Sequence, residues 1–327
     1  MRRLLLLPAI LALVACQPPF QPPGRPAAST PSASLVRLWQ DATIFDVARR
    51  LLDGAKTRLW VEMYEFDRPD LAAAMEAAKV RGVDVRLVYD PSVPQTLATA
   101  LRLAGHGVAA RAYPLDDRRR QIDHVKLVLA DQAALVGGMN WGRNSAANHD
   151  YALEVPSGDS RLVSIFEQDW SFAAGQLPAT PPPAARSVQT APGEEIRAAL
   201  TRALRRARVS VRAEVFVLTD VDVMHELAAA ARRGVSVRVL LDPRQDVNRP
   251  SRLLLRQAGV EVRWFPAPKG SKLHAKAGLF DGRLLLGSAN WSFGGLSVNH
   301  ELDLEIEEPL TAERFRARFD ADWGASG

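Results

Sequence analysis

The sequence predicts an α/β fold built from two similar halves, each with a β-sheet covered by helices. Three observations lead to this prediction. The chain has 327 residues, of which 47% are hydrophobic and 24% charged, and this composition excludes a largely disordered or polytopic membrane protein. A pattern within residues 36–174 recurs within residues 194–327. Helical and strand-like segments alternate within each half, which favours a layered sheet.

The chain begins with a segment typical of an export signal. Residues 1–15 hold two arginines and then an apolar run that is shorter than the roughly 20 residues a membrane span needs. The Leu-Val-Ala-Cys that ends at Cys16 resembles the signal box of bacterial lipoproteins, which implies cleavage before Cys16 and its lipidation. We therefore expect an exported bacterial lipoprotein, anchored to the cell membrane or outer membrane and facing the periplasm or cell surface. An ordinary secretory signal with an incidental cysteine is the alternative.

Two segments rich in proline, alanine and serine divide the rest of the chain. Residues 16–35 are expected to be a disordered, lipid-anchored tether, and residues 175–193 a linker. The first domain would then span 36–174 and the second 194–327. Cys16 is the only cysteine in the sequence, which excludes an intramolecular disulfide and a thiolate metal cluster.

The two halves align with only small changes of offset. RGVDVRLVYDP at 81–91 matches RGVSVRVLLDP at 233–243, an offset of 152. Later segments repeat with offsets of 150 and 151, namely HVKLVLADQAALVGGMNW (124–141) with HAKAGLFDGRLLLGSANW (274–291), and NHDYALEV (148–155) with NHELDLEI (299–306). Agreement over such lengths indicates a duplication. Duplicated domains usually pack about a pseudo-twofold axis, so one active site at their interface can use equivalent loops from both.

The expected elements follow the chain in the same order in each half. The first segment has apolar residues at helical spacing and is expected to be a helix. A strand follows it, then an alanine-rich helix that ends at a glycine in the C-cap position, and then a short strand rich in β-branched residues. These segments are 41–54, 57–66, 69–82 and 83–90 in the first half, and 194–207, 209–218, 220–234 and 235–242 in the second.

A second set of matched residues carries the chemistry. Each half has a His-x-Lys sequence, with an aspartate five residues after the lysine and an asparagine sixteen after the histidine. Displacement at a phosphodiester needs a nucleophile, a proton for the leaving oxygen and positive charge on the other oxygens. Alternation along a strand places each histidine and its lysine on one face. The two imidazoles and two ammonium groups thus surround one phosphate, with no metal or other cofactor required. The matched residues of the pattern are His124, Lys126, Asp131 and Asn140 in the first half, and His274, Lys276, Asp281 and Asn290 in the second.

This HxK(x)4D…G(S/G)xN pattern resembles that of the phospholipase D superfamily, over residues 36–325. The resemblance implies two homologous α/β/α sandwich domains related by a pseudo-twofold axis. It also implies a phosphohistidine intermediate, with His124 as nucleophile and His274 as the acid that protonates the leaving alcohol. Near-symmetry leaves the reverse assignment open.

The same resemblance gives roles to residues around the histidines. Asn140 and Asn290 are expected beside the phosphate, and Ser288 is expected to bind substrate. Gly138 takes the place of that serine in the first half, a form that cardiolipin-synthase-like members share. Asp150 and Glu301 stand where the family has an acid that orients a catalytic imidazole.

Other matched residues have expected supporting or structural roles. Glu62 and Glu214 lie mid-strand among apolar residues and are expected to meet polar groups near the site, because a buried carboxylate without a partner is costly. Asp131 and Asp281 are expected to be turn and packing residues. His149 and His300 are expected to be structural, with a site role as the alternative. Trp141 and Trp291 are expected to pack the domain interface or line the mouth of the site. The basic loops 116–123 and 267–273 are expected to be solvated, with an anionic headgroup or nucleic acid as alternatives.

The leading functional interpretation is a metal-independent phospholipase-D-type phosphodiesterase. It would cleave or transfer the headgroup of phospholipids in a bilayer, its expected partner, and leave phosphatidic acid. Cardiolipin-synthase-like transfer follows from the same intermediate. The alternatives are a metal-independent nuclease and a noncatalytic membrane-surface protein. Net charge is +5, or +3 once Arg2 and Arg3 are removed, which is weak support for nucleic-acid binding. No obligate protein partner is expected, and the two-domain site predicts a monomer.

Overall fold

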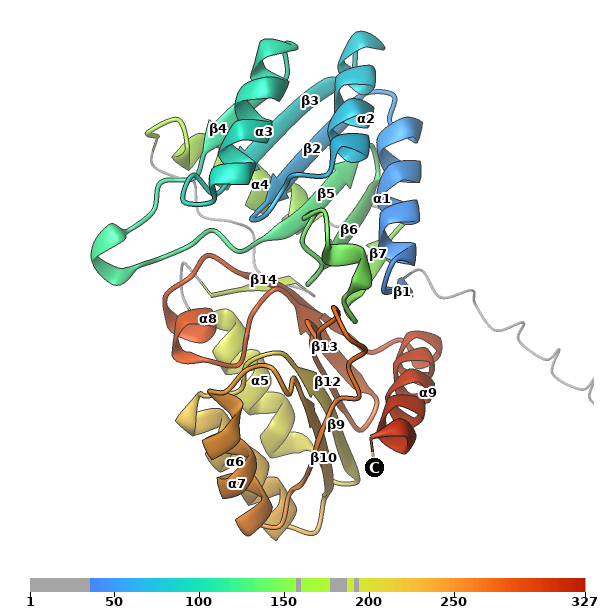
Figure 1. Cartoon of the computed structure of the whole chain (residues 1–327), viewed down its shortest axis with the longest axis vertical. Coiled ribbons are helices and arrows are strands. Elements are labelled where there is room, and N and C mark those ends of the chain that lie inside the picture. Colours follow the sequence, from blue (N-terminus) through green and yellow to red (C-terminus); the bar gives the residue numbers. More distant parts are fainter. Residues whose placement is uncertain (1–35, 157–159, 177–186, 191–193, 327) are drawn as a thin grey trace, which may run out of the picture. The chain divides into compact units, whose positions relative to one another are not determined.

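The structure is a computed structural model that describes residues 36–156, 160–176, 187–190 and 194–326 (Figure 1). These residues belong to one compact unit. The predicted signal peptide, Cys16, the tether and most of the linker lie outside the described residues. Among those described, no helix is both long and apolar enough to cross a bilayer.

The first half forms a mixed seven-stranded sheet in which three parallel strands continue into antiparallel ones. In sheet order its strands are β1 (Arg37–Gln40), β7 (Tyr151–Val155), β6 (Ala133–Gly137), β5 (Lys126–Ala130), β2 (Arg58–Met63), β3 (Asp84–Tyr89) and β4 (Ala109–Ala112). Its helices are α1 (Thr43–Gly54), α2 (Pro69–Val80), α3 (Pro94–Gly105) and α4 (Ser160–Phe172), with short 3-10 turns at Asp117–Arg119 and Ser145–Ala147.

The second half repeats this sheet. Its strands, in order, are β11 (Glu261–Trp264), β10 (Ser236–Leu241), β9 (Ser210–Val215), β12 (Lys276–Phe280), β13 (Arg283–Gly287), β14 (Leu302–Ile306) and β8 (Ser187–Gln189). Its helices are α5 (Glu195–Arg206), α6 (Val221–Arg232), α7 (Asn248–Gln257), α8 (Phe293–Ser297) and α9 (Pro309–Ala325). The predicted pair of α/β domains is confirmed.

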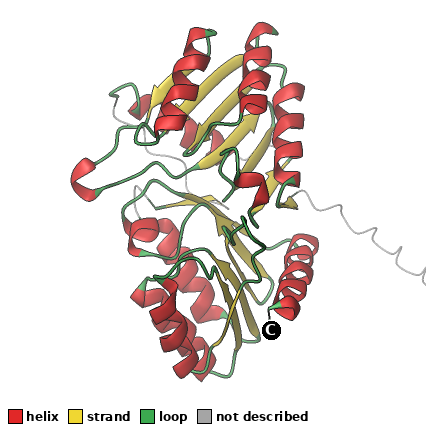
Figure 2. Cartoon of the chain, viewed as in Figure 1, coloured by secondary structure: helices red, strands yellow, loops and turns green. Residues whose placement is uncertain are grey.

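Helices cover both faces of each sheet because the strands are apolar on both sides (Figure 2). In β5, Val128 and Ala130 pack with α1 and α2 in one cluster, whereas the alternate residues Leu127 and Leu129 join Phe166 of α4 in another. In the second half α5, α6 and α7 share one cluster, and α9 takes the place of α4. Each half is therefore a three-layer sandwich.

The two halves share part of their core. The cluster that contains α4 also contains α9 and side chains from β5, β12, β13 and β14. Strand β6 contacts β14, and β13 contacts β7. Since β5 and β12 begin at the lysines of the two His-x-Lys segments, the shared core fixes the position of one motif against the other.

One element lies inside the range predicted as linker. Residues 187–189 form β8, which pairs antiparallel with β14 through Leu302, Asp303 and Leu304. Its counterpart β1 pairs with β7 in the same way. The second sheet therefore begins before residue 194, because this short edge strand is held by its partner and not by a hydrophobic run of its own.

Candidate active site

The two His-x-Lys segments are each tied to the opposite half. The backbone amide of His124 donates to the carbonyl of His300 at 2.8 Å, and the amide of His274 donates to the carbonyl of His149 at 2.8 Å. Lys126 and Lys276 then open the central strands β5 and β12. Backbone pairing between the halves thus places the two segments in one site.

Both imidazoles are held by carboxylates that come from the other half. His274 Nδ1 lies 2.7 Å from Asp150 Oδ2, and His124 Nδ1 lies 2.8 Å from Glu301 Oε2. A hydrogen on Nδ1 donated to a carboxylate leaves the Nε2 lone pair free to act as nucleophile or base. Each imidazole is thus held by one of the two predicted acids, with the partners crossed between the halves.

The two histidines and two lysines are all buried, and burial lowers the pKa of each. His124, Lys126, His274 and Lys276 are only 2% to 5% exposed. Burial lowers the pKa of His124 to about 4, that of Lys126 to about 7 and that of Lys276 to about 8. Burial, reinforced by the charges of the lysines, lowers the pKa of His274 well below its ordinary value. Both imidazoles are thus neutral at pH 7.

These pKa values predict a bell-shaped pH profile. We expect kcat/KM to require neutral His124, whose pKa is about 4, and to fall toward alkaline pH as the acid His274 and then, above about pH 7 to 8, Lys126 and Lys276 lose their protons. Initial rates measured from pH 3.5 to 10 at subsaturating substrate would check this. A rate that continues to rise through pH 10 would contradict it.

The two orienting carboxylates differ in their surroundings. Ser288 Oγ donates to Glu301 Oε2 at 2.6 Å, and Asn299 Nδ2 donates to Glu301 Oε1 at 3.1 Å. Against the effect of burial, the neighbouring His124 lowers the pKa of Glu301, whereas burial raises that of Asp150. Ser288 was predicted to bind substrate, but its hydroxyl is fully buried against Glu301 and so supports that carboxylate.

Gly138 provides the space in which Asp150 lies. A Cβ added to Gly138 would lie 2.3 Å from Asp150 Oδ1, so the serine of the second half cannot be accommodated here without a shift. This contact explains the departure from symmetry. Gly138 therefore shapes the support of His274 and offers the substrate no side chain.

We expect Gly138→Ala to displace Asp150 and lower both stability and turnover. Overpacking of this kind costs about 1–3 kcal/mol of unfolding free energy, which urea unfolding would measure. Gly282→Ala is the matched control, because a Cβ there meets no atom within 4 Å. Equal behaviour of the two variants would contradict the assignment.

Each histidine and lysine pair borders an aromatic ring. Tyr64 lies 4.9 Å from His124 between ring centroids, and Lys126 Nζ lies 5.1 Å from the Tyr64 ring. Phe216 repeats this arrangement, 4.9 Å from His274 and 5.0 Å from the ammonium of Lys276. These aromatic residues, which the sequence analysis did not identify, limit the space around the site and help to desolvate the ammonium groups.

The two asparagines follow β6 and β13, which pair with the strands β5 and β12 that the two lysines open. Asn140 Nδ2 donates to Glu65 Oε2 at 2.9 Å. The side-chain oxygens of Asn140 and Asn290 accept no hydrogen bond from the described residues. Glu65 was missed because Val217 occupies its place in the second half, so the repeat gave no signal.

Glu62 and Glu214 meet histidines of the opposite half. Glu214 Oε2 lies 2.7 Å from His149 Nε2, and Glu62 Oε1 lies 3.4 Å from His300 Nε2. All four side chains are at most 5% exposed. As expected, each glutamate meets a polar group, and through the backbone of His149 and His300 each pair lies directly behind one His-x-Lys segment.

Asp131 and Asp281 occupy tight turns, as expected. Both have positive φ, 50° and 54°. Asp131 accepts hydrogen bonds from the backbone amides of Lys56, Thr57 and Arg58, and Asp281 accepts three from residues 208–210. These carboxylates fasten the β5–β6 and β12–β13 turns to the start of β2 and β9.

We expect Asp131→Ala to destabilise the fold and leave turnover per folded molecule unchanged. Three amide donors lose a charged acceptor, and bonds of that kind contribute about 1–3 kcal/mol each. Thermal unfolding and kcat of the folded fraction would check this. A large loss of kcat at unchanged stability would show that Asp131 acts in the reaction.

The expectation for the two tryptophans was wrong. Trp141 and Trp291 are each 1% exposed and pack against Phe66 and Phe280 within the cores of their own halves. Each tryptophan points away from the asparagine that precedes it, because side chains of neighbouring extended residues lie on opposite sides of the backbone.

The basic loop at 116–123 also makes specific contacts. Arg119 donates to the carbonyl of Ser297 at 2.7 Å, and Gln121 donates to that of Val298 at 2.8 Å. This loop is therefore hydrogen-bonded to the second half. The loop at 267–273 is held by Arg244 of its own half, which donates to the carbonyls of Ser271 and Pro268, and by the amide of His149 in the first half, which donates to the carbonyl of Lys272 at 2.9 Å.

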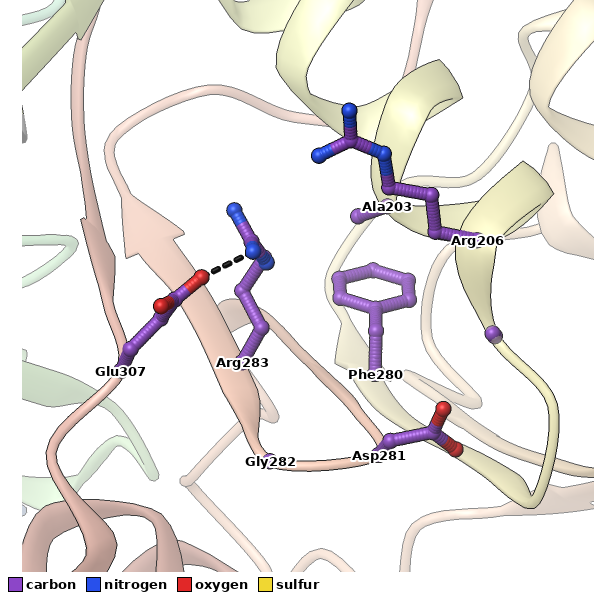
Figure 3. Close-up of a pocket in the computed structure, with 8 residues that line it drawn as sticks. Ala203, Arg206, Phe280, Asp281, Gly282, Arg283 and Glu307 are labelled. Atoms are coloured by element: carbon purple, nitrogen blue, oxygen red, sulfur yellow. Dashed lines mark ion pairs between the residues drawn. The ribbon is translucent and has the colours of Figure 1, made fainter.

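A separate pocket of about 370 Å³ lies far from these residues (Figure 3). It is formed at the β12–β13 turn around Phe280 and Asp281, with the ion pair of Arg283 and Glu307 on one side. Lys276 is at the other end of β12. The converging groups, and not this pocket, mark the candidate active site.

The family model described as "Cardiolipin synthase, PLD-like domain" matches residues 48–170 and again residues 200–323. The chain belongs to this family. The two matches confirm both the duplication and the phospholipase D resemblance inferred from the His-x-Lys pattern.

Individual proteins are similar at lower identity. Cardiolipin synthase A of Yersinia pseudotuberculosis serotype O:1b (strain IP 31758) is 28% identical over 284 residues, which cover 73% of this chain and 57% of that protein. The chain thus spans little more than half the length of these curated relatives. Phosphatidylserine synthase of Haemophilus influenzae Rd KW20 has a TM-score of 0.71 at 13% identity, covering 90% of this chain and 86% of that one. Polyphosphate kinase of Porphyromonas gingivalis has a TM-score of 0.66 at 17% identity, covering 87% and 46%. These two structures show the shared fold.

Proposed function

We propose that this protein is a phosphatidyl-transferring phosphodiesterase that acts on membrane phospholipids. The observation that carries the proposal is the pair of buried histidines, each held by a carboxylate of the other half and accompanied by a lysine. Such an arrangement supplies a nucleophile, an acid and positive charge for one phosphodiester. The acceptor is an alcohol, as in cardiolipin synthesis, or water, which gives phosphatidic acid.

In the first step, Nε2 of His124 attacks phosphorus. A P–N bond forms, the bond to the headgroup oxygen breaks, and His274 gives that oxygen a proton. Lys126 and Lys276 stabilise the charge on the remaining oxygens. The bound phosphodiester anion offsets the lysine charges that depress the pKa of His274, so it favours the protonated acid when substrate is present.

In the second step, the acceptor hydroxyl gives its proton to His274 and attacks phosphorus. The P–N bond breaks as a new P–O bond forms. The product is phosphatidic acid when the acceptor is water and a second phosphodiester when it is an alcohol. No step in this scheme passes through a metal ion. The two steps share one site and differ only in which hydroxyl occupies it.

Two observations support a phospholipid substrate. The matching family and the curated relatives are named for cardiolipin synthase. The signal sequence with Cys16 predicts an exported lipoprotein held at a membrane, and this remains a prediction because Cys16 lies outside the described residues. We propose that the lipid anchor holds the monomeric enzyme beside its substrate on the cell membrane or outer membrane.

The test uses the purified full chain with vesicles of phosphatidylglycerol and phosphatidylethanolamine, in the presence and absence of EDTA. Mass spectrometry would follow cardiolipin, other transfer products and phosphatidic acid, with His274→Ala as the control. We expect product from the wild type in both buffers and none from the variant. Cardiolipin would identify transfer, and phosphatidic acid hydrolysis.

A folded wild-type protein that yields no lipid product under either condition would overturn the proposed substrate. Plasmid cleavage in EDTA that is lost in His124→Ala would then establish the nuclease alternative.

A further inference from the structure

A buried cluster behind the His124 segment has more negative charge than its protein partners balance. It consists of Glu62, Asp123, Asp169 and His300, which are 0%, 0%, 6% and 0% exposed. His300 Nε2 lies 3.1 Å from Asp169 Oδ2 and 3.4 Å from Glu62 Oε1. Within the part of the chain that the structure describes, His300 forms ion pairs with Glu62 and Asp169, and Asp123 has no cation in an ion pair with it.

Several carboxylate oxygens of this first cluster are unsatisfied. Among the described residues, neither oxygen of Glu62 accepts a hydrogen bond, and neither does Asp123 Oδ2. A buried carboxylate whose oxygens lack hydrogen-bond donors destabilises the fold. These oxygens belong to fully buried side chains whose ligand atoms, with His300, lie within 4.8 Å of one another.

The second half shows how the same fold balances such a cluster. There His149 lies against Glu214, Asp41 and Asp322, and Arg318 supplies a second cation. The Arg318 guanidinium lies 2.6 Å from Asp322 and 3.3 Å from Asp41. Every carboxylate of this second cluster thus has a cation within 3.6 Å, although one Glu214 oxygen accepts no hydrogen bond from the described residues.

Alignment of the halves shows what the first cluster lacks. Asp169-Trp170 matches Asp322-Trp323, which places apolar Ile165 at the position of Arg318. Asp123 stands where the second half has Leu273. The first cluster has therefore gained a carboxylate at one position and has no guanidinium at another.

We propose that Glu62, Asp123, Asp169 and His300 bind one divalent transition-metal ion, such as Zn²⁺ or Mn²⁺, which links the two halves. Three carboxylates and an imidazole nitrogen are suitable ligands for these ions. Ligands about 2.0–2.2 Å from an ion lie within about 4.4 Å of one another, so small side-chain movements complete the site. With a neutral His300, the ion leaves the cluster with the same net charge that Arg318 and protonated His149 give the second cluster.

The ion lies behind the reacting histidines and contributes to stability, so the inference is independent of the proposed reaction.

The test measures metal content and thermal stability of the purified full chain. Mass spectrometry of the metal is done before and after dialysis against EDTA, and again after addition of ZnCl2 or MnCl2 and gel filtration. We expect one ion per chain and a melting temperature that rises with metal concentration. Folded wild-type protein that holds no ion, and whose melting temperature neither salt changes, would overturn the proposal.

Variants locate the site. Glu62→Gln and Asp123→Leu should lose the bound ion, and Asp123→Leu copies the residue found at Leu273. Asp322→Asn, the matched change in the second cluster, should keep it. Circular dichroism would confirm that each variant is folded. Retention of the ion by both first-cluster variants, or its loss from Asp322→Asn, would place the ion elsewhere and refute the assignment.

Discussion

Replacement of His124 by alanine should reduce phosphatidyl transfer by about 10⁴-fold or more, because it removes the nitrogen to which the proposed mechanism assigns the P–N bond. His274→Ala should cause a comparable loss of overall turnover for a different reason. It removes the proton needed by the leaving alcohol and the base needed in the second step. Turnover of phospholipid vesicles by both variants would check these values, and His225→Ala, at an exposed position, should retain wild-type activity.

The two histidine variants also separate nucleophile from acid. When His274→Ala is incubated with substrate and quenched, we expect phosphate on His124, and peptide mass spectrometry would locate it. Label found only on His274 in His124→Ala would reverse the two roles. The near-symmetry of the sequence left this choice open, and the trapped residue decides it directly.

Neutralising an orienting acid should be almost as damaging as removing a histidine. We expect Glu301→Gln and Asp150→Asn to lower kcat by about 10²- to 10⁴-fold, because an amide oxygen neither holds the imidazole in the required tautomer as firmly nor stabilises its positive charge. The two effects should differ in kind. Glu301→Gln should slow formation of the covalent intermediate on His124, whereas Asp150→Asn should slow both its formation, which needs His274 as acid, and its breakdown, which needs His274 as base.

Rapid-quench measurement of the intermediate would distinguish these effects. The control is Glu305→Gln on β14, whose carboxylate pairs with Arg202 and Arg283 away from the histidines. If Glu301→Gln changed only the breakdown of the intermediate, the crossed pairing of Glu301 with His124 would not be the functional one.

The duplication made most of the fold predictable from the sequence. Strands such as β3 and β10 combine β-branched periodicity with a helix that ends at glycine, and these local signals are sufficient to place them. Strand β8 was not predictable in the same way. It is three residues long and lies in a segment rich in proline, and it is a strand only because β14 offers it hydrogen bonds.

The site was predictable where the two halves agree. His124, His274, Asp150 and Glu301 lie at matched positions, and their types already indicated the chemistry. Features without a repeat could not be predicted, such as Glu65. Contacts that depend on packing also could not, as the buried hydroxyl of Ser288 shows.

The crossed carboxylates make the two halves dependent on each other in a way that the fold alone does not require. His124 needs an acid carried 177 residues later, and His274 needs one carried 124 residues earlier. We therefore expect a change within one half to impair a histidine in the other. Each half has its own sheet, but neither contains both a histidine and the acid that holds it. Gly138 and Ser288 can differ because each suits the acid beside it, Asp150 and Glu301 respectively.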